Sequence, residues 1–320
     1  MKPASIISLV IAVLLIVVGL VSCFIAQNMA KANGEYLFSE DRGSDLVTTV
    51  DLTDSEISKI ELIASKVQIN IYGRQDKSYI EFVNFKENYY SLSNANRVLS
   101  FDEIPDIKSM LKFWENGFSF KGMRYIFNFN NTVDESKDKV INVYLSSDKE
   151  IKIFDIKSDD LVLNISDMTT GTDYNITTKN AVISGNVLRT SSTFNINAGT
   201  SDSPAEKVDL ELSTALIQYI NINAKELNMN ADKFRCAGSA AINSESGAIS
   251  IGTISQLDII NMDLTSASGK ITLDGSEVLS SYTHTNVDSA RGEIIINTDS
   301  SDITIYRSSS SESAEEEEAK

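Results

Sequence analysis

One block of turn and strand residues occurs three times in the last quarter of the chain. In each copy a glycine is followed by apolar residues that alternate with other side chains, at residues 244–251, 266–273 and 289–296. The steps between the three glycines are 22 and 23 residues. A fixed period of this length indicates a stack of coils, because no such unit can bury its apolar face alone. The sequence therefore predicts an all-β fold, a β-solenoid similar to a parallel β-helix.

The glycines of the three blocks are Gly247, Gly269 and Gly292. Each precedes a predicted strand, so we expect corners with a positive φ, which glycine adopts readily. A phosphate-binding loop would also need a helix N-terminus and a lysine, and no helical pattern follows these glycines. We interpret all three as structural turn residues.

The alternating pattern extends upstream to Val140 as two interleaved series of strand-like segments. The usual step within a series is 19 to 23 residues, with one longer step near residues 199–206. We therefore predict about 21 residues and two strands per coil. The apolar residues predicted to point into the coil are Ile176, Ile196, Ile222, Met229, Ile251, Leu273 and Ile296.

Asparagines alternate with these apolar residues and are predicted to point outward: Asn175, Asn195, Asn197, Asn221, Asn223, Asn228 and Asn230. If the coils stack in register, the side-chain amides can hydrogen-bond from one coil to the next. Alternatively, asparagine tolerates the left-handed backbone that coil corners require. Both roles are compatible with the sequence.

Residues 5–26 contain no charged residue and include fifteen of Ile, Leu, Val and Phe. A helix of this length spans the hydrocarbon core of a bilayer. We predict a single-pass transmembrane anchor at residues 1–27 that places Ser5, Ile11, Ile16 and Ala26 in the membrane. We expect the N-terminus in the cytoplasm and the body of the chain outside, because long domains are translocated largely regardless of charge.

A lipid anchor is the alternative for this segment. The residues from Leu20 to Cys23 resemble a bacterial lipobox, in which the cysteine becomes acylated after cleavage. Apolar residues continue after Cys23, however, and the apolar run exceeds the roughly 7–15 residues of a cleaved secretory signal. These two features favour the transmembrane anchor.

Four segments are predicted along the chain: the anchor at 1–27, a linker and first strand region at 28–54, the strand-repeat domain at 55–306, and an acidic, disordered tail at 307–320. The repeat lapses near residues 86–139, where Ile104, Ile107, Met110, Leu111 and Trp114 share one face of a predicted helix. We expect this insert to cover the open end of the first coil; alternatively, it docks on the membrane or a partner.

The chain carries 45 acidic and 28 basic residues, a net charge of −17. Nucleic acids and anionic lipids are bound by clusters of lysine and arginine, so nucleic-acid binding is not expected. The two cysteines are Cys23, in the anchor, and Cys236. An intramolecular disulfide therefore cannot stabilise the domain, and its stability must come from stacking.

Three sequence features resemble a bacterial family of β-strand-repeat proteins known as "putative adhesin". They are Ile60-Glu-Leu with Val67-Gln-Ile-Asn-Ile, then Val140-Ile-Asn-Val-Tyr-Leu, and the repeated Ser-x-x-Gly blocks. The resemblance covers residues 55–306 and implies a domain that often follows an N-terminal membrane anchor. It also implies a role in adhesion or in envelope stress, and it implies no catalytic residues.

The residues themselves argue against catalysis. The single histidine, His284, lies in a segment predicted to be an outward-facing strand, and the clustered cysteines and histidines of a zinc site are absent. Acidic residues are scattered over predicted turns: Asp159, Asp160, Asp173, Asp263, Asp274, Asp288 and Asp302. Loose calcium binding at these turns is conceivable, but the spaced pattern of a calcium-binding loop is absent.

We therefore predict a non-enzymatic surface module without a cofactor, whose partners are the bilayer, through the anchor, and an envelope protein or polysaccharide. The alternative is a carbohydrate-active β-helix enzyme of the cell envelope. That enzyme would need two or three acidic side chains within about 5–10 Å of one another.

Overall fold

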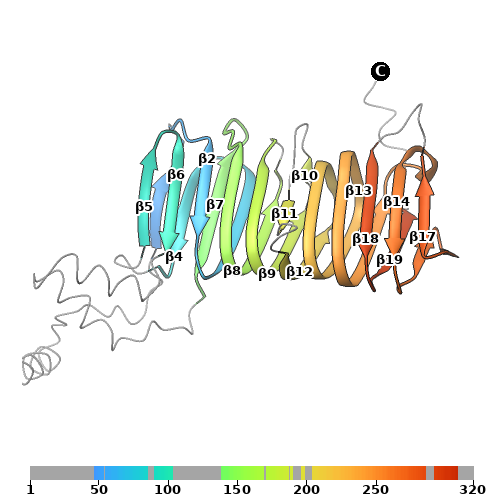
Figure 1. Cartoon of the computed structure of the whole chain (residues 1–320). Helices are drawn as coiled ribbons and strands as arrows, with labels where there is room; N and C mark the ends of the chain where they lie inside the picture. Colours follow the sequence, from blue (N-terminus) through green and yellow to red (C-terminus); the bar gives the residue numbers. More distant parts are fainter. Residues whose placement is uncertain are drawn as a thin grey trace, which may run out of the picture. The chain divides into compact units, whose positions relative to one another are not determined.

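The computed structural model describes residues 47–53, 55–85, 90–103, 138–168, 171–186, 188–189, 196–198, 204–285 and 292–308. These residues form an all-β fold, as predicted, in which nineteen strands hydrogen-bond into one continuous sheet (Figure 1). Among them the structure has one short 3-10 turn, η2 (Leu257–Ile259). No helix of this part of the chain is long and apolar enough to cross a membrane.

The strands in the first half of the described chain are β1 (Val47–Asp51), β2 (Lys59–Ile63), β3 (Lys66–Gln75), β4 (Tyr79–Val83), β5 (Tyr90–Ala95), β6 (Val98–Glu103), β7 (Val140–Ser146), β8 (Ile153–Ser166), β9 (Asp173–Asn186) and β10 (Leu188–Arg189). Those in the second half are β11 (Ile196–Ala198), β12 (Ala205–Leu212), β13 (Ala215–Thr253), β14 (Asn261–Ser266), β15 (Ile271–Leu273), β16 (Ser276–Val278), β17 (Ser281–His284), β18 (Glu293–Thr298) and β19 (Asp302–Arg307).

The central strands pair in parallel with strands about twenty residues away. Ile153 of β8 is in register with Asp173 of β9, 20 residues on. Val208 of β12 is in register with Leu227 of β13, 19 residues on, and also with Ala181 of β9, 27 residues back. The regular step and the single longer one therefore both agree with the sequence analysis.

The long strand β13 passes through the stack twice. Asn243 Nδ2 in its second pass donates a hydrogen bond of 3.0 Å to Asn223 Oδ1 in its first. Just beyond the second pass, Ile254 N donates to Phe234 O at 3.1 Å. The two passes therefore lie side by side, again about twenty residues apart.

The strands at the C-terminal side do not stack in sequence order, which corrects the simple repeat reading. Strand β18 pairs in parallel with the second pass of β13 on one side and with β14 on the other. Strand β19 pairs likewise with β13 and β15. The third glycine block therefore lies between the first and the second, as β18 lies between β13 and β14 in Figure 1.

The N-terminal side has the same arrangement. Strand β2 lies between β6 and β8, and β3 lies between β7 and β8. Strands β2 and β3 precede β6 and β7 in the sequence, yet they lie closer to the centre of the stack. On each side, the strands nearest the chain terminus are thus covered by a neighbouring pair on both edges.

Antiparallel strands close both sides. On the N-terminal side β4 pairs with β7, β5 with β6, and β1 with β4. On the C-terminal side β17 pairs with β14 and β16 with β15. Strand β1 lies in the region predicted as linker and first strand. The insert helix that we predicted as a cover lies outside the described residues.

Alternate residues of the strands fill the core. Of the residues predicted to point inward, Ile176, Ile222, Met229, Ile251 and Ile296 are buried and Leu273 is partly buried; the side chain of Ile196 lies outside the described part. On the N-terminal side the core becomes aromatic, and the ring of Phe101 lies 4.6 Å from that of Phe82 and 4.7 Å from that of Phe85. Each buried side chain of this kind contributes about 1.5–3 kcal/mol.

Candidate functional site

The glycines of the repeated blocks occupy tight corners. Gly247 has a φ of 123° and Gly292 a φ of 127°, a conformation that other residues rarely adopt. A Cβ at Gly247 would lie 2.0 Å from Leu227 O, and one at Gly292 would lie 1.9 Å from Cys236 O. These glycines are needed for the close approach of two backbone segments.

Gly269 differs from the other two. It is not among the glycines with a positive φ, so that expectation was wrong for this block. A Cβ there would lie 2.1 Å from Ser301 O, so the approach of the neighbouring backbone is what requires glycine. Gly269 N donates to Ser266 Oγ at 2.9 Å, which explains the serine three residues before this glycine.

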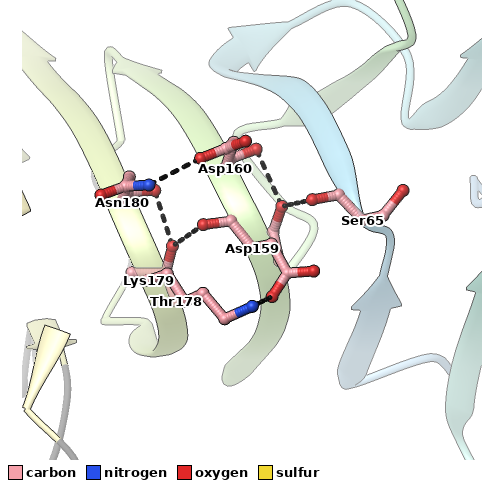
Figure 2. A network of polar contacts seen from close by, with 7 residues as sticks. Ser65, Asp159, Asp160, Thr178, Lys179 and Asn180 are labelled. Atoms are coloured by element: carbon pink, nitrogen blue, oxygen red, sulfur yellow. Dashed lines mark hydrogen bonds and ion pairs between the residues drawn. The ribbon is translucent and has the colours of Figure 1, made fainter. Parts of the chain in front are cut away.

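Figure 2 shows a polar network at a corner where β3, β8 and β9 lie side by side. Asp159 N donates to Ser65 O at 3.0 Å. Asn180 Nδ2 donates to Asp160 Oδ1 at 2.8 Å, and Lys179 Nζ lies 2.8 Å from Asp159 Oδ1. The adjacent aspartates are thus each matched by a side chain of the next coil.

The same corner continues with alternating charges on β12 and β13. Lys207 Nζ lies 2.8 Å from Glu226 Oε1, and Lys225 Nζ lies 3.3 Å from Glu206 Oε1. The hydrogen bond from Lys207 and its positive charge lower the pKa of Glu226. A catalytic acid needs a raised pKa, so this carboxylate is suited to pairing between coils.

Polar pairs also cross the other outer surface of the stack. Asp155 of β8 receives a 2.7 Å hydrogen bond from Asn175 Nδ2 of β9 and lies 2.5 Å from Lys59 Nζ of β2. Burial raises the pKa of Asp155, but the hydrogen bonds from Lys59 and Asn175 outweigh burial, so the pKa falls below its usual value. Asn175 therefore forms the contact between coils that the sequence predicted, although its partner is an aspartate.

A row of amides crosses the outer surface of β8, β3, β7 and β4. Asn164 Nδ2 donates to Asn70 Oδ1 at 2.8 Å, Asn70 Nδ2 donates to Asn142 Oδ1 at 2.8 Å, and Asn142 Nδ2 donates to Glu81 Oε2 at 3.3 Å. Asn70 at the centre is only 6% exposed. We did not predict this row, although an Asn-x-Tyr pattern at 70–72 and 142–144 is a visible signal for it.

A row of tyrosines lies two residues further along the same strands. The Tyr144 ring of β7 stacks on Tyr72 of β3 at 5.2 Å and on Tyr79 of β4 at 4.4 Å. The three side chains are half-buried. Burial and the nearby Glu81 carboxylate raise the pKa of Tyr144, so its hydroxyl remains a hydrogen-bond donor. On β8 the residue in register with Tyr72 is the small Ser166, where the row ends.

His284 does not face outward, which corrects our expectation. It pairs directly with Met262 across β17 and β14, and Met262 is buried. Residues opposite each other in an antiparallel pair point to the same side of the sheet, so the imidazole lies on the core side of the closing strand. Its Nε2 donates to Asp258 O at 3.0 Å.

No reactive group emerges from the remaining candidates in the part of the chain that the structure describes. Cys236 is a free, buried thiol, and burial raises its pKa to about 11. Within this part, no three His, Cys, Asp or Glu side chains gather to hold a metal ion. The predicted anchor residues Ser5, Ile11, Ile16 and Ala26 and the predicted lipidation site Cys23 lie outside the described residues.

Comparisons with known proteins give only distant similarities. No family model matches the chain, and no curated protein matches it. Among solved structures, it is similar to a "putative cell adhesion protein" from Clostridium sporogenes at 12% identity and a TM-score of 0.28, over 82% of this chain and 99% of that one.

Two structures from Parabacteroides distasonis are comparable. One is a "putative adhesin" at 11% identity and a TM-score of 0.26, over 83% of this chain and 98% of that one. The other is a "putative lipid binding protein" at 10% identity and a TM-score of 0.24, over 83% and 97%. Similarities at this level do not establish a shared family or function.

Proposed function

We propose that the chain is a membrane-anchored β-solenoid outside the cytoplasm that binds a macromolecule of the cell envelope and catalyses no reaction. The pairing of the corner charges with one another carries this proposal. Lys179 is matched to Asp159, and Lys207 to Glu226, across adjacent coils. Such ladders stabilise a long, regular surface that is suited to binding a long partner.

The solenoid architecture is supported by the parallel register. Strands one coil apart pair from β8 through β9 and β12 to β13 with steps near twenty residues. Each coil contributes one strand segment on either side of a corner such as Ser158–Asp160 in β8. The core between them is lined by isoleucine, leucine and valine.

The anchor and the location belong to the same proposal. Residues 1–27 span the membrane once with the N-terminus in the cytoplasm, and lipidation at Cys23 is the alternative. The partner is an envelope protein or polysaccharide, and the role is adhesion or the sensing of envelope stress. Mass spectrometry of the mature N-terminus tests the anchor: an intact Met1 supports the transmembrane form, and an acylated Cys23 at the N-terminus contradicts it.

The alternative of a carbohydrate-active enzyme gains no support from the described carboxylates. Asp209 and Glu226 both lie within 4.0 Å of the same ammonium group, Lys207 Nζ. Burial raises the pKa of Asp173, the direction that a general acid needs. If Asp173→Asn abolished glycan hydrolysis by the purified chain, the non-enzymatic proposal would be wrong.

Crosslinking on intact cells tests the binding role. A photoreactive amino acid placed at exposed outer positions, for instance at Val182, should form adducts with one defined envelope component. The matched control places the same group at Met262, which is buried and should give no adduct. Repeated absence of adducts from every outer surface on live cells would contradict the proposal.

A further inference from the structure

One part of the outer surface differs from the rest in carrying no charge. We define the uncharged face as the outward side chains of β7, β3, the second half of β8 and the second half of β9, which lie next to one another in that order. Its rows are formed by Val140, Val162 and Val182, by Asn142, Asn70 and Asn164, and by Tyr144 and Tyr72. Gln68, two serines and Asn186 complete it.

The same rows become charged where they continue onto the following strands. Val182 of β9 is in register with Asp209 of β12, and Ser184 with Glu211. Ala248 of β13 is followed across the sheet by Asp302 of β19. In a chain with a net charge of −17, an uncharged surface four strands wide stands apart. The acidic surroundings repel polyanions, so the uncharged face is suited to an uncharged ligand.

Apolar side chains on this face are open to solvent. Val162 is 38% exposed and Val182 is 46% exposed, and the two are in register on neighbouring strands. Tyr72 ends the row of stacked rings beside the small Ser166. One face of the Tyr72 ring is therefore directed toward a shallow part of the surface. Valine methyl groups and an aromatic ring face match the C–H side of a sugar ring.

The amides on this face are held in place before any ligand arrives. Asn164, Asn70 and Asn142 donate to one another in a single direction, and Gln68 Nε2 donates to Asn70 Oδ1 at 3.0 Å. An amide has two N–H donors and two acceptor sites on its oxygen, so these bonds leave further donors and acceptors for sugar hydroxyls. Fixed side chains lose little conformational entropy on binding.

We infer that the uncharged face binds an uncharged polysaccharide of the cell envelope. Sugar C–H groups pack on Tyr72 and on the exposed valines, and sugar hydroxyls exchange hydrogen bonds with the asparagine row. The strand spacing of about 4.8 Å repeats this chemistry across the sheet, so that a chain of sugars can follow it. This inference rests on the proposed binding function and names its partner and surface.

Binding of the full chain in detergent micelles to immobilised polysaccharides tests the inference. The probes are mannan, laminarin, dextran and the neutral polysaccharide fraction of the source cell envelope, with polygalacturonate as the anionic control. The full chain should bind at least one neutral probe and should not bind polygalacturonate. Tyr72→Ala and Val162→Glu should each weaken binding about tenfold or more, because one removes the stacking ring and the other adds a charge.

The matched control is Tyr219→Ala, which removes a tyrosine that is 41% exposed on another outer surface. Its affinity should stay within about twofold of the unchanged chain, and thermal unfolding should show that all three variants are folded. Equal losses in the three variants, binding of polygalacturonate, or no binding of any neutral probe would overturn the inference. If crosslinking on live cells still yields one envelope protein in that case, the proposed function stands and only the polysaccharide is wrong.

Discussion

At the N-terminal side of the stack Phe101 packs among Phe82, Phe85 and Tyr90, whereas at the C-terminal side Leu264 meets Tyr282 on the closing strand. Both sides switch from parallel to antiparallel pairing at the outermost strands. The C-terminal closure includes a local hairpin, β15–β16, with positive φ at Asp274 (46°) and Gly275 (80°).

The difference between the two sides lies in how far apart in sequence the closing strands are. The N-terminal closure joins β1, β4 and β5 to strands up to β7, so segments almost one hundred residues apart must meet. Large rings fill the space between them and offset part of the entropy of closing long loops. The C-terminal hairpin needs only a short turn and correspondingly less aromatic area.

The strand order is the feature that both sides share and that a crosslink can break. With both natural cysteines replaced by alanine, Asn243→Cys with Asn297→Cys should form a disulfide on mild oxidation, because these exposed residues are in register on adjacent strands. Asn243→Cys with Thr265→Cys should not, because β18 lies between them and two strand spacings exceed the reach of a disulfide. Peptide mass mapping decides, and the reverse result would restore sequential stacking.

Sequence alone predicted the alternation and the corners but could not predict this order. Burial of Ile251 and Ile296 follows from period-two alternation, which is local. The choice of neighbour for β18 depends instead on whether β13 or β14 offers a free edge, and all of these strands carry similar Ile-rich patterns. The inward position of His284 was missed for the same reason, because a strand's two faces are assigned only by its partner.

Corner glycines should give the largest stability effect of any single substitution discussed here. Gly247→Ala should cost about 5 kcal/mol or more of unfolding free energy, or prevent folding, because the new Cβ would lie 2.0 Å from Leu227 O at a φ of 123°. The matched control is Gly275→Ala in the C-terminal hairpin. It has a φ of 80° but nothing within 4 Å of the added Cβ, and should cost only about 1 kcal/mol. Equal losses in urea denaturation would refute the close-approach argument.

The two closures should differ when an aromatic ring is removed from each. Phe101→Ala should cost about 3–5 kcal/mol, because Phe101 is fully buried among three other rings. Tyr282→Ala should cost about 1–2 kcal/mol, since Tyr282 is only partly buried against the core. Hydrogen exchange should show that Phe101→Ala loosens β5 and β6 before β14. A larger loss from Tyr282→Ala would reverse our comparison of the two ends.

The smallest expected effect concerns acid stability midway between the two closures, at Asp155. Its pKa lies below the ordinary value in the folded chain, because the hydrogen bonds from Lys59 and Asn175 outweigh burial. A lowered folded pKa contributes stability above the unfolded value of about 3.9, and that stability is lost as the pH falls through the folded pKa. Asp155→Asn should therefore reduce stability at pH 7 by about 1 kcal/mol or less, since Asp155 and Lys59 remain partly exposed. Below about pH 3 the variant and the unchanged chain should converge in chemical denaturation. A difference that persists or grows at low pH would mean that the carboxylate contributes by packing and not by its charge.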